Sequence, residues 1–342
     1  GRLIMGLLVH SKDRIKIVGD KSLSKRDFMR IINPLKNFGA KFKSNNGKLP
    51  ISIMGTNHAR PIKYHENKGS AQVKSAVMLA ALNTNGTTYI KAKKSRNHSE
   101  LAFQHLGLKI KINKKKNYDL IKIKGKRNIK PFNYNIPSDI SSSAFFIVLT
   151  ALSKKSKLKI KNVNVNPTRI GILKILKKMG VNIKLQNYKK YKGEKIADII
   201  VKSNNPLKAI NCPSDLNSTA IDEFLLIFLI AAKAKGISYF KNLSELNQKE
   251  SPRLIWGSKI LNKMGIKTIL TNDSIKIFGN PKLKISKDII IKNFLKDHRV
   301  FMTSVVAALT FGGNWAISDP GSIKTSFPTF MSKIKILGAK FN

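Results

Sequence analysis

The chain has 342 residues, of which 65 are Lys or Arg and 18 are Asp or Glu, so its formal net charge is +47. With 42% hydrophobic residues it is too apolar to be disordered and long enough for one large core or two domains. No uncharged apolar run approaches the ~20 residues of a membrane span, and no signal-peptide pattern is present. The single cysteine, Cys212, excludes an internal disulfide and a multi-cysteine zinc site. These features predict a cytoplasmic protein with no membrane partner.

Lysine carries most of the positive charge. Only ten of the 65 basic residues are arginine, and the lysines are spread among many isoleucines and asparagines. A nucleic-acid-binding module more often shows clustered arginine with exposed aromatic residues. Lysine, isoleucine and asparagine have A+T-rich codons, so nucleotide bias accounts for the excess without a nucleic-acid partner. A lysine-rich nucleic-acid-binding repeat protein therefore stays only as the non-enzyme alternative.

One pattern recurs five times: an amphipathic helix ends at an apolar residue and a glycine, and an alternating strand follows. The glycines, spaced 68, 73, 85 and 73 residues apart, are Gly39, Gly107, Gly180, Gly265 and Gly338. Glycine at this place is typical of a left-handed helix cap that turns the chain into the next strand. The recurrence predicts a protein built from units of about 70 residues.

Each unit also contains a more apolar helix, a short strand and a polar loop before the amphipathic helix. In chain order, we expect apolar helices at residues 3–9, 74–83, 144–152, 223–234 and 300–309. We expect strands after them at residues 15–17, 89–90, 158–160, 237–240 and 315–317, and a further strand at 121–123. This alternation of helices and period-2 strands predicts a mixed α/β architecture.

The first unit is incomplete in this interpretation. Gly1 leads directly into an apolar helix, with no start methionine and no strand before it. We expect that N-terminal material used by the fold is missing, and that residues 1–342 alone are less active than a longer parent protein. A protein of five complete units is the alternative.

Charged and polar residues recur at matching places in the units. Those at or near the start of an apolar helix are Arg2, Gln72, Asp222 and Arg299. Those in the loop before the amphipathic helix are Arg26, Arg96, Arg253 and Lys324. Helix N-termini favour anions, and arginine binds phosphate and carboxylate in a bidentate manner. One such arginine is more often a solvated surface charge, but a set in register predicts a site for several phosphate or carboxylate groups.

Short motifs surround these residues in a fixed order. They are Ser24–Asp27 (SKRD), Ser70–Ala76 (SAQVKSA), Asn166–Arg169 (NPTR), Ile221–Glu223 (IDE), Lys249–Arg253 (KESPR), Asp297–Arg299 (DHR) and Lys324–Pro328 (KTSFP). From Gly1 to Phe330 they resemble the 5-enolpyruvylshikimate-3-phosphate synthase family, the 3-phosphoshikimate 1-carboxyvinyltransferases. The KESPR and DHR segments are specific as a pair, whereas either alone is a weak signal.

The resemblance implies the enolpyruvyl transferase fold, an inside-out α/β barrel of two domains. Each domain in that family is built from three βαβαββ units, and the substrates bind in the cleft between the domains. By this resemblance the first βαβαββ unit is missing here. The first domain, which binds the substrate phosphate, covers residues 1–165. The second covers residues 166–342 and carries Asp222, Lys249, Arg253 and Arg299.

The resemblance also implies the reaction. The family transfers the enolpyruvyl group of phosphoenolpyruvate to the 5-hydroxyl of shikimate 3-phosphate, with release of phosphate, on the route to chorismate and the aromatic amino acids. The residues that match its ligands for shikimate 3-phosphate are Ser70, Ala71, Gln72, Arg96, Asp222 and Lys249. The residues that match its ligands for phosphoenolpyruvate are Arg26, Gln72, Arg253, Arg299 and Lys324. Three of these positions would be catalytic: Asp222 as the base, Lys249 on the hydroxyl, and Glu250 for proton transfer at the methylene carbon.

Neither a metal nor an organic cofactor is implied, and the family is usually monomeric. Pro252 departs from the family, which usually has an acid there, so Arg253 lacks one potential partner. Other roles stay open for single residues: a helix cap for Asp222, a structural hydrogen bond for His298, and a hinge or packing role for Arg169. The enzyme alternative is the UDP-N-acetylglucosamine enolpyruvyl transferase, which typically uses a loop cysteine. Cys212 lies away from the anion-binding loops, and a buried thiol is the expected state.

Overall fold

The structure, a computed structural model, describes residues 1–125, 129–203 and 206–341. Its contacts divide the chain into two compact units. The first comprises Gly1–Asn135 with Lys192–Glu194, and the second comprises Ile136–Tyr191 with Lys195–Asn342. This division differs from the predicted domain boundary after residue 165. Residues 136–165 belong to the second unit because helix α6 (Ile140–Leu152) packs against helix α9 (Phe224–Lys233) and strand β8 (Lys157–Asn164) pairs with β10 (Glu194–Lys202).

The first unit contains two small sheets and five α-helices within its described residues. The helices are α1 (Ile4–Leu7), followed by a 3-10 turn η1 (Leu8–His10), α2 (Lys21–Ser24), α3 (Met29–Lys36), α4 (Ala71–Asn83) and α5 (His98–His105). The strands are β1 (Arg14–Ile17), β2 (Lys41–Asn45), β3 (Lys48–Met54), β4 (Lys63–Glu66), β5 (Thr87–Lys93), β6 (Ile110–Lys114) and β7 (Tyr118–Lys124). One sheet is antiparallel in the order β1-β3-β2. The other has the order β4-β5-β7-β6, with β4 and β5 parallel and the remaining pairs antiparallel.

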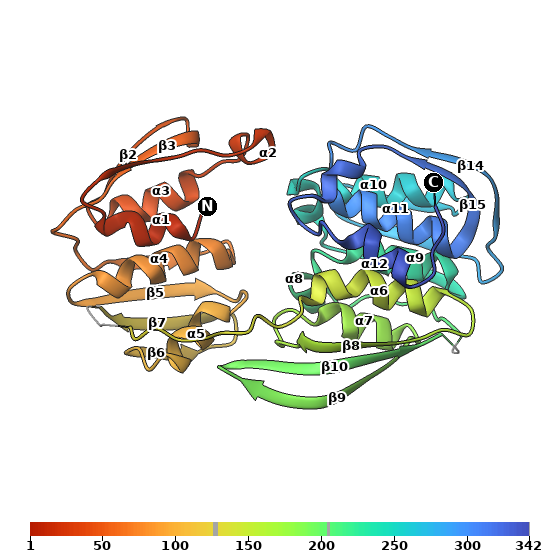
Figure 1. Ribbon diagram of the computed structural model, residues 1–342, viewed down its shortest axis with the longest axis horizontal. Coiled ribbons are helices and arrows are strands. Elements are labelled where there is room, and N and C mark those ends of the chain that lie inside the picture. Colours follow the sequence, from red (N-terminus) through yellow and green to blue (C-terminus); the bar gives the residue numbers. More distant parts are fainter. Residues whose placement is uncertain (126–128, 204–205, 342) are drawn as a thin grey trace. The chain divides into compact units, whose positions relative to one another are not determined.

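Helix α4 forms the centre of the first unit. It packs against α1 and α3 on one side and against β5 and β7 on the other, as Figure 1 shows. Its sequence is apolar on nearly all sides, which is typical of a helix buried between two layers. The helix begins at Ser70, whose Oγ accepts a hydrogen bond from the N–H of Val73 at 3.3 Å. The SAQVKSA motif is therefore the first part of a buried helix whose N-terminus is capped by serine.

The described residues of the second unit form three sheets and a larger set of helices. The helices besides α6 and α9 are α7 (Gly171–Lys178), α8 (Asn217–Ala220), α10 (Arg253–Lys263), α11 (His298–Phe311) and α12 (Phe330–Ile336). The 3-10 turns are η2 (Ser214–Leu216), η3 (Ser244–Gln248) and η4 (Pro320–Ile323). The strands besides β8 and β10 are β9 (Asn182–Tyr191), β11 (Gly236–Phe240), β12 (Thr268–Leu270), β13 (Ile275–Gly279), β14 (Ile285–Ile291) and β15 (Gly312–Ile317). The sheet orders are β8-β10-β9, β11-β13-β12 and β14-β15, and the last pair is parallel.

Helix α9 is the core of the second unit. Its sequence FLLIFLIAAK is buried over almost its whole length, and it contacts α6, α7, α10, α11 and β13. The rings of Phe224, Phe228 and Phe240 pack on one another, with 5.3 Å between the centroids of Phe228 and Phe240. This helix fixes the position of the residues just before it, including Asp222.

The five repeated glycines all adopt a left-handed backbone. Their φ values are 106° at Gly39, 66° at Gly107, 90° at Gly180, 85° at Gly265 and 96° at Gly338. This confirms the predicted helix caps, and β2, β6, β9 and β12 follow the first four glycines. The strand predicted after Gly338 is wrong. Residues 339–341 pair with none of the described strands, and a strand requires a hydrogen-bonded neighbour.

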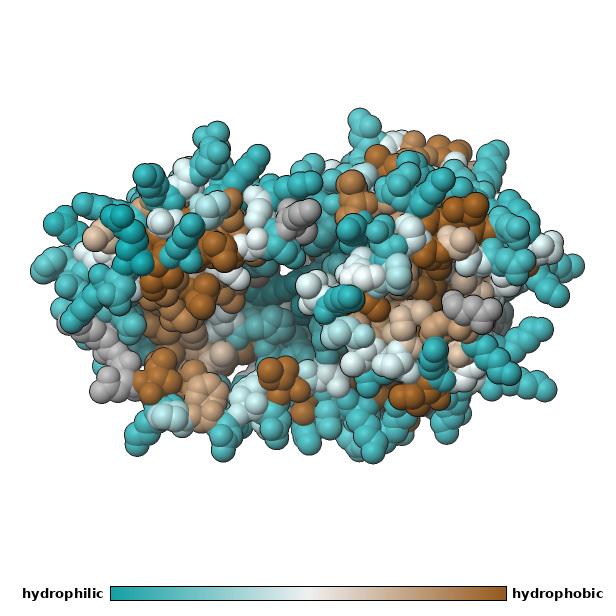
Figure 2. Space-filling model, turned by 45° about the horizontal axis from the view of Figure 1, so that its top comes forward, coloured by the Kyte–Doolittle hydropathy of each residue, from teal (hydrophilic) through white to brown (hydrophobic). Residues whose placement is uncertain are grey.

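Hydrophilic side chains cover most of the face that Figure 2 shows, and hydrophobic residues appear between them in smaller groups. The interiors of the two units are instead formed by separate clusters of aliphatic and aromatic side chains. The distribution is consistent with the interpretation of most lysines as solvated surface charges. In the described part of the chain, no helix is both long and apolar enough to cross a membrane.

Candidate active site

A buried cluster of charged side chains joins α10 to α11 in the second unit. Arg253, the first residue of α10, is 2% exposed, and Asp297, the residue before α11, is fully buried. Asp297 accepts hydrogen bonds from Nε of Arg253 at 2.8 Å and from Nη2 at 3.2 Å. It also accepts from Ser251 Oγ at 2.8 Å and from the backbone N–H of Arg299 at 2.9 Å. One carboxylate thus holds the KESPR segment against the start of the DHR helix.

Asp222 lies at the edge of this cluster. Its Oδ1 is 3.3 Å from Nζ of Lys249 and 3.7 Å from Nη1 of Arg253. Glu250 forms a close ion pair with Nη2 of Arg253. The side chains of Asp222, Lys249 and Glu250 are between 16% and 25% exposed, so solvent or a ligand can reach them. The structure therefore brings the three predicted catalytic residues together around the buried guanidinium.

A second network reaches Asp222 from the opposite direction. Nη1 of Arg299 donates a hydrogen bond to the backbone oxygen of Asp222 at 2.7 Å and lies 3.6 Å from Oε1 of the buried Glu223. That oxygen accepts a hydrogen bond from Ser141 Oγ at 2.5 Å. Nη2 of Arg169 in turn donates to Ser141 Oγ at 2.6 Å. Arg169 therefore belongs to the network that holds Arg299.

The surroundings shift several pKa values in the second unit. Burial acts to lower the pKa of Arg253, but Asp297, Glu250 and Asp222 outweigh it, so the pKa is raised. Burial acts to raise the pKa of Asp297, and Arg253 together with hydrogen bonds more than reverses this, so the pKa is lowered. Both groups are thus charged at neutral pH. The pKa of Glu223 is raised, chiefly by burial.

His298, the first residue of α11, has a pKa lowered by burial and next by the charge of Arg299. The structural hydrogen bond expected for this side chain is not present, since its ring bonds to none of the described residues. The histidine is half-buried, and burial together with Arg299 and Arg253 outweighs Asp297 and Glu250, so its charged form is disfavoured.

The first unit holds a cluster of arginines near the start of α4. Arg2 donates from Nη1 to Oε1 of Gln72 at 2.8 Å and from Nη2 to the backbone oxygen of Asp27 at 3.1 Å. Burial lowers the pKa of Arg2, and the positive charges of Arg26 and Arg30 lower it further. Asp27 acts in the opposite direction, as an anionic ligand near these arginines would. The cluster is therefore suited to a phosphate or carboxylate group.

Lys74 connects α4 to the loop that carries Arg96. Its Nζ donates to the backbone oxygen of Arg96 at 2.9 Å and is 2.5 Å from Oε1 of Glu100. The side chains of Lys74 and Glu100 are 1% and 3% exposed, so this is a buried ion pair. The pair fixes the backbone of Arg96 relative to Ser70, the residue that caps α4.

The other residues predicted to belong to the site can be described by their positions in the secondary structure. Ala71 is the first residue of α4, and Lys324 follows η4 with an exposed side chain that forms no ion pair within the described residues. Arg253 lies inside α10 rather than in the loop before it, because α10 begins one residue after Pro252. No group of three His, Cys, Asp or Glu side chains in the described ranges could hold a metal ion.

Several residues of these networks were not predicted as site residues from the sequence: Lys74, Glu100, Ser141, Glu223 and Asp297. For two of them, Lys74 and Glu223, the sequence itself contains an indication of a buried charge. Lys74 lies inside an apolar helix and Glu223 directly before one, and a charge there requires a buried partner. The identity of the partner follows only from the fold.

The sequence profile of the family described as EPSP synthase (3-phosphoshikimate 1-carboxyvinyltransferase) matches residues 1–334. The 3-phosphoshikimate 1-carboxyvinyltransferase of Ruthia magnifica subsp. Calyptogena magnifica is 41% identical over 342 residues, which are 100% of this chain and 77% of that protein. The enzyme of the same name from Vesicomyosocius okutanii subsp. Calyptogena okutanii is 40% identical over 98% of this chain and 76% of that protein.

The chain also resembles solved structures. The EPSP synthase of Acinetobacter baumannii superimposes with a TM-score of 0.86 and 35% identity, covering 98% of this chain and 76% of that one. The enolpyruvyl transferase NikO of Streptomyces tendae superimposes with a TM-score of 0.69 at 15% identity, a likeness of fold alone.

Proposed function

Because the chain belongs to the EPSP synthase family, we propose that it transfers the enolpyruvyl group of phosphoenolpyruvate to the 5-hydroxyl of shikimate 3-phosphate, with release of phosphate. The observation that carries the proposal is the cluster of Asp222, Lys249 and Glu250 around Arg253. It combines acids that can move protons with cations that can hold anions, and the reaction requires both.

In the second unit, Asp222 would act as the base that takes the proton of the 5-hydroxyl. Lys249, 3.3 Å from Asp222, would hold the same hydroxyl and keep it next to the carboxylate. Glu250 is 25% exposed and would serve proton transfer at the methylene carbon. Both the addition and the elimination step need such a transfer, since the carbon gains a proton first and loses one later.

The cations would bind the anionic groups of the substrates. We assign Arg253, Arg299 and Lys324, with Arg26 and Gln72, to phosphoenolpyruvate. The guanidinium of Arg253 is oriented by Asp297 and that of Arg299 by Glu223, so the direction of both cations would be set before substrate binds. Fixed cations stabilise the charge that develops in the tetrahedral intermediate without having to reorient.

In the first unit, the N-terminus of α4 would hold the phosphate of shikimate 3-phosphate. Ser70, Ala71 and Gln72 begin this helix of 13 residues, where the first N–H groups point to an anion. Arg96 would add its charge, with its backbone held by Lys74. A monomeric state, a cytoplasmic location and the lack of a cofactor stay predictions.

Phosphate release tests the proposal. The purified protein, together with any residues that precede Gly1 in its gene product, is assayed with phosphoenolpyruvate and either shikimate 3-phosphate or UDP-N-acetylglucosamine. We expect phosphate release only with shikimate 3-phosphate, and a decrease of about 10²- to 10⁴-fold in Asp222→Asn. Asp215→Asn, an exposed carboxylate seven positions away in the same segment, is the matched control and should keep full activity. Turnover of UDP-N-acetylglucosamine, or full activity of Asp222→Asn, would contradict the proposal.

A further inference from the structure

Three helices of the second unit begin beside one buried carboxylate. Helices α6, α9 and α11 pack on one another (Figure 1), and Glu223 is the residue that precedes α9. Glu223 is 2% exposed. Its Oε1 accepts a hydrogen bond from Ser141 Oγ in α6 at 2.5 Å and lies 3.6 Å from Nη1 of Arg299 in α11. The carboxylate is therefore shielded from water but lies beside a cation that we assign to phosphoenolpyruvate.

The hydrogen bonds of Ser141 fix the direction of its hydroxyl proton. Nη2 of Arg169 can only donate, and it donates to Ser141 Oγ at 2.6 Å. The single proton of the hydroxyl must then point to Oε1 of Glu223, so this oxygen carries no proton of its own. One cation thus supports the charged form of Glu223 directly, and a second supports it through a hydroxyl group.

Burial opposes this charge. Burial raises the pKa of Glu223 most and Asp222 raises it further, whereas Arg299 and Arg169 lower it, and the net shift is upward. The charged groups that face Glu223 are thus Arg299 from α11, Arg169 from the loop before α7 and Asp222 from its own segment. At the start of α6, Asp139 lies 3.3 Å from Arg169 and partly balances it. A carboxylate held between opposing effects in this way responds when a neighbouring charge changes.

An anion bound to Arg299 is such a change. The side chain of Arg299 is 14% exposed, so a ligand can reach its guanidinium while Nη1 stays beside Glu223. The added negative charge disfavours the ionised form of Glu223. Protonation of Glu223 removes this repulsion without loss of the bond from Ser141, because Oε1 of a neutral carboxyl group still accepts.

The ion pairs around Arg253 and Arg299 offer no surplus of positive charge. They join four cations to five carboxylates, namely Arg169, Lys249, Arg253 and Arg299 to Asp139, Asp222, Glu223, Glu250 and Asp297. Lys324, the other cation of this unit assigned to phosphoenolpyruvate, makes the set neutral. A ligand with both a phosphate and a carboxylate group then creates an excess of negative charge, which a proton can reduce.

We propose that Glu223 takes up a proton from solvent when the anionic groups of phosphoenolpyruvate bind Arg299. This inference rests on the proposed function, which assigns Arg299 to that substrate. The proton adds to the carboxylate as the anion binds and returns to solvent when the anion leaves, so no other bond forms or breaks. Affinity for the anion then decreases as pH rises, because the complex holds a proton that the free protein lacks.

Calorimetric titration counts the proton. Phospholactate keeps the phosphate and carboxylate of phosphoenolpyruvate but lacks its double bond, so it cannot react. The protein, with any residues that precede Gly1 in its gene product, is saturated with shikimate 3-phosphate and titrated between pH 5 and pH 8 in buffers of different ionisation enthalpy. We expect the parent to take up about 0.5 to 1 proton more per bound ligand than Glu223→Gln within this range. Equal proton uptake by the two proteins at every pH overturns the proposal.

Affinity separates this role of Glu223 from a structural one. Glutamine is neutral without a proton, so Glu223→Gln should bind phospholactate about tenfold more tightly than the parent at pH 8. The difference should become smaller toward pH 5, where the parent is protonated more easily. Binding that is weaker than the parent's by one constant factor at all pH values would show that Glu223 only supports the packing, and would contradict the proposal.

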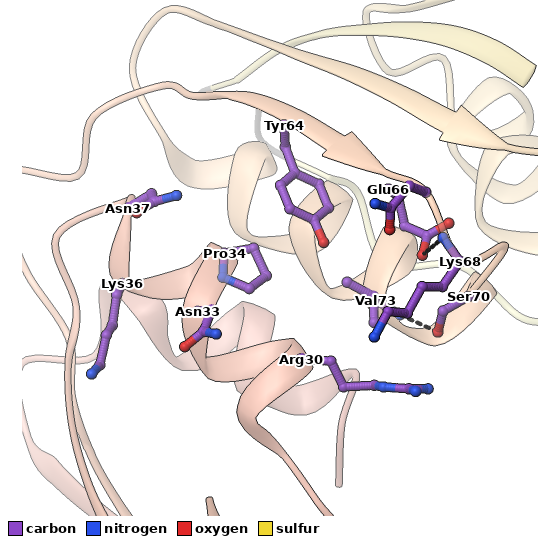
Figure 3. A pocket seen from close by; sticks show the side chains of 11 residues that line it. Arg30, Asn33, Pro34, Lys36, Asn37, Tyr64, Glu66, Lys68, Ser70 and Val73 are labelled. Carbon is purple, nitrogen blue, oxygen red and sulfur yellow. Dashed lines mark hydrogen bonds between the residues drawn. The ribbon is translucent and has the colours of Figure 1, made fainter. Parts of the chain in front are cut away.

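Glu66→Gln is the matched control, because Glu66 is a buried carboxylate at 3% exposure in the first unit. It lies in the wall of a hollow of about 510 Å³, and Figure 3 shows its Oε1 accepting from the backbone N–H of Lys68. Glu66 forms no ion pair with an arginine in the described part of the chain. Glu66→Gln should therefore take up as many protons as the parent, and a loss equal to that of Glu223→Gln would contradict the assignment to Glu223.

Ser141→Ala tests the same group without removing it. The variant loses a hydrogen bond that favours the charged carboxylate, so the pH of greatest proton uptake should be higher than in the parent. Ser142→Ala, in the same turn, loses a bond to Asp139 at 3.2 Å and should keep the parent's profile. If Ser141→Ala also keeps that profile, the proton does not reside on Glu223.

Turnover distinguishes this inference from the proposed function. A parent protein that releases phosphate from phosphoenolpyruvate and shikimate 3-phosphate, but takes up no more protons than Glu223→Gln, contradicts this inference alone. A parent protein that neither turns over these substrates nor binds phospholactate contradicts both.

Discussion

Asp297 holds the guanidinium of Arg253 through two hydrogen bonds, at 2.8 Å from Nε and 3.2 Å from Nη2. The two residues are 44 positions apart, and neither charge is exposed to water. Their contact connects the start of α10 to the start of α11. The position of Arg253 next to Asp222 and Glu250 therefore depends on a carboxylate that no substrate needs to touch.

Asp297→Asn should destabilise the protein strongly. The substitution keeps the shape of the side chain but replaces the buried anion beside Arg253 with a neutral amide, so only the partly exposed Glu250 and Asp222 still balance the guanidinium. We expect a loss of about 3 kcal/mol in the free energy of unfolding, measured by urea denaturation. Asp119→Asn is the control, because its partner Lys94 is 45% exposed, and it should cost less than about 1 kcal/mol. Equal losses of unfolding free energy in the two variants would show that the buried Asp297–Arg253 pair stabilises the protein no more than the exposed Asp119–Lys94 pair does.

Lys74→Met should leave the charge of Glu100 buried without its cation. We expect a loss of about 3 kcal/mol of stability, and most of it should return in Lys74→Met/Glu100→Gln, where neither charge remains. Affinity for shikimate 3-phosphate should stay low in the double variant, because the backbone oxygen of Arg96 has still lost its donor. Denaturation and calorimetry on the three proteins distinguish the two effects. Full recovery of affinity in the double variant would mean that Lys74 does not position Arg96.

Glu223→Gln should change how stability depends on pH. Burial raises the pKa of Glu223 above its ordinary value of 4.5, although Arg299 opposes this. The folded protein then binds the proton more tightly than the unfolded chain, so the parent loses stability as pH rises from about 4.5 through the raised pKa. Glutamine does not titrate, so the variant should gain stability relative to the parent across this window. Urea denaturation between pH 4 and pH 8 measures the difference, and a constant difference would contradict the prediction.

Cys212 should react slowly with thiol reagents. Burial, with a smaller contribution from Asp215, raises the pKa of its thiol to about 11, so little thiolate is present at pH 8. It is the chain's single cysteine, so mass spectrometry after iodoacetamide treatment reports on this site alone. We expect slow labelling of the folded protein, rapid labelling in urea, and full activity of Cys212→Ser. Loss of turnover in Cys212→Ser would favour the cysteine-dependent class of enolpyruvyl transferase.

Local features could be predicted well from the sequence. The five glycine caps depend on residues within one turn, and the apolar helices depend on composition over about three turns, so a single sequence contains the necessary information. Helices α4, α6, α9 and α11 all lie where apolar segments were expected. The helix expected at residues 3–9 became a short α-helix followed by a 3-10 turn.

Long-range partners could not be predicted in this way. Ser141 and Glu223 are 82 positions apart, and nothing in either segment specifies the other. The division into the two compact units also depends on a long-range contact, the pairing of strand β8 with β10, and not on composition near residue 165. The resemblance identified motif positions, while the structure adds the buried carboxylates that orient their cations.

The glycines that cap the helices do not all tolerate substitution equally well during evolution. At Gly265 an added Cβ would meet no atom within 4 Å, so only the backbone angle opposes substitution, and asparagine tolerates that angle. At Gly180 a Cβ would lie 2.6 Å from the backbone oxygen of Pro206, which cannot move aside as a flexible side chain can. A lineage under mutational pressure toward asparagine codons can therefore lose Gly265 and keep a folded protein. Gly180 is constrained both by its backbone angle and by the nearby oxygen of Pro206.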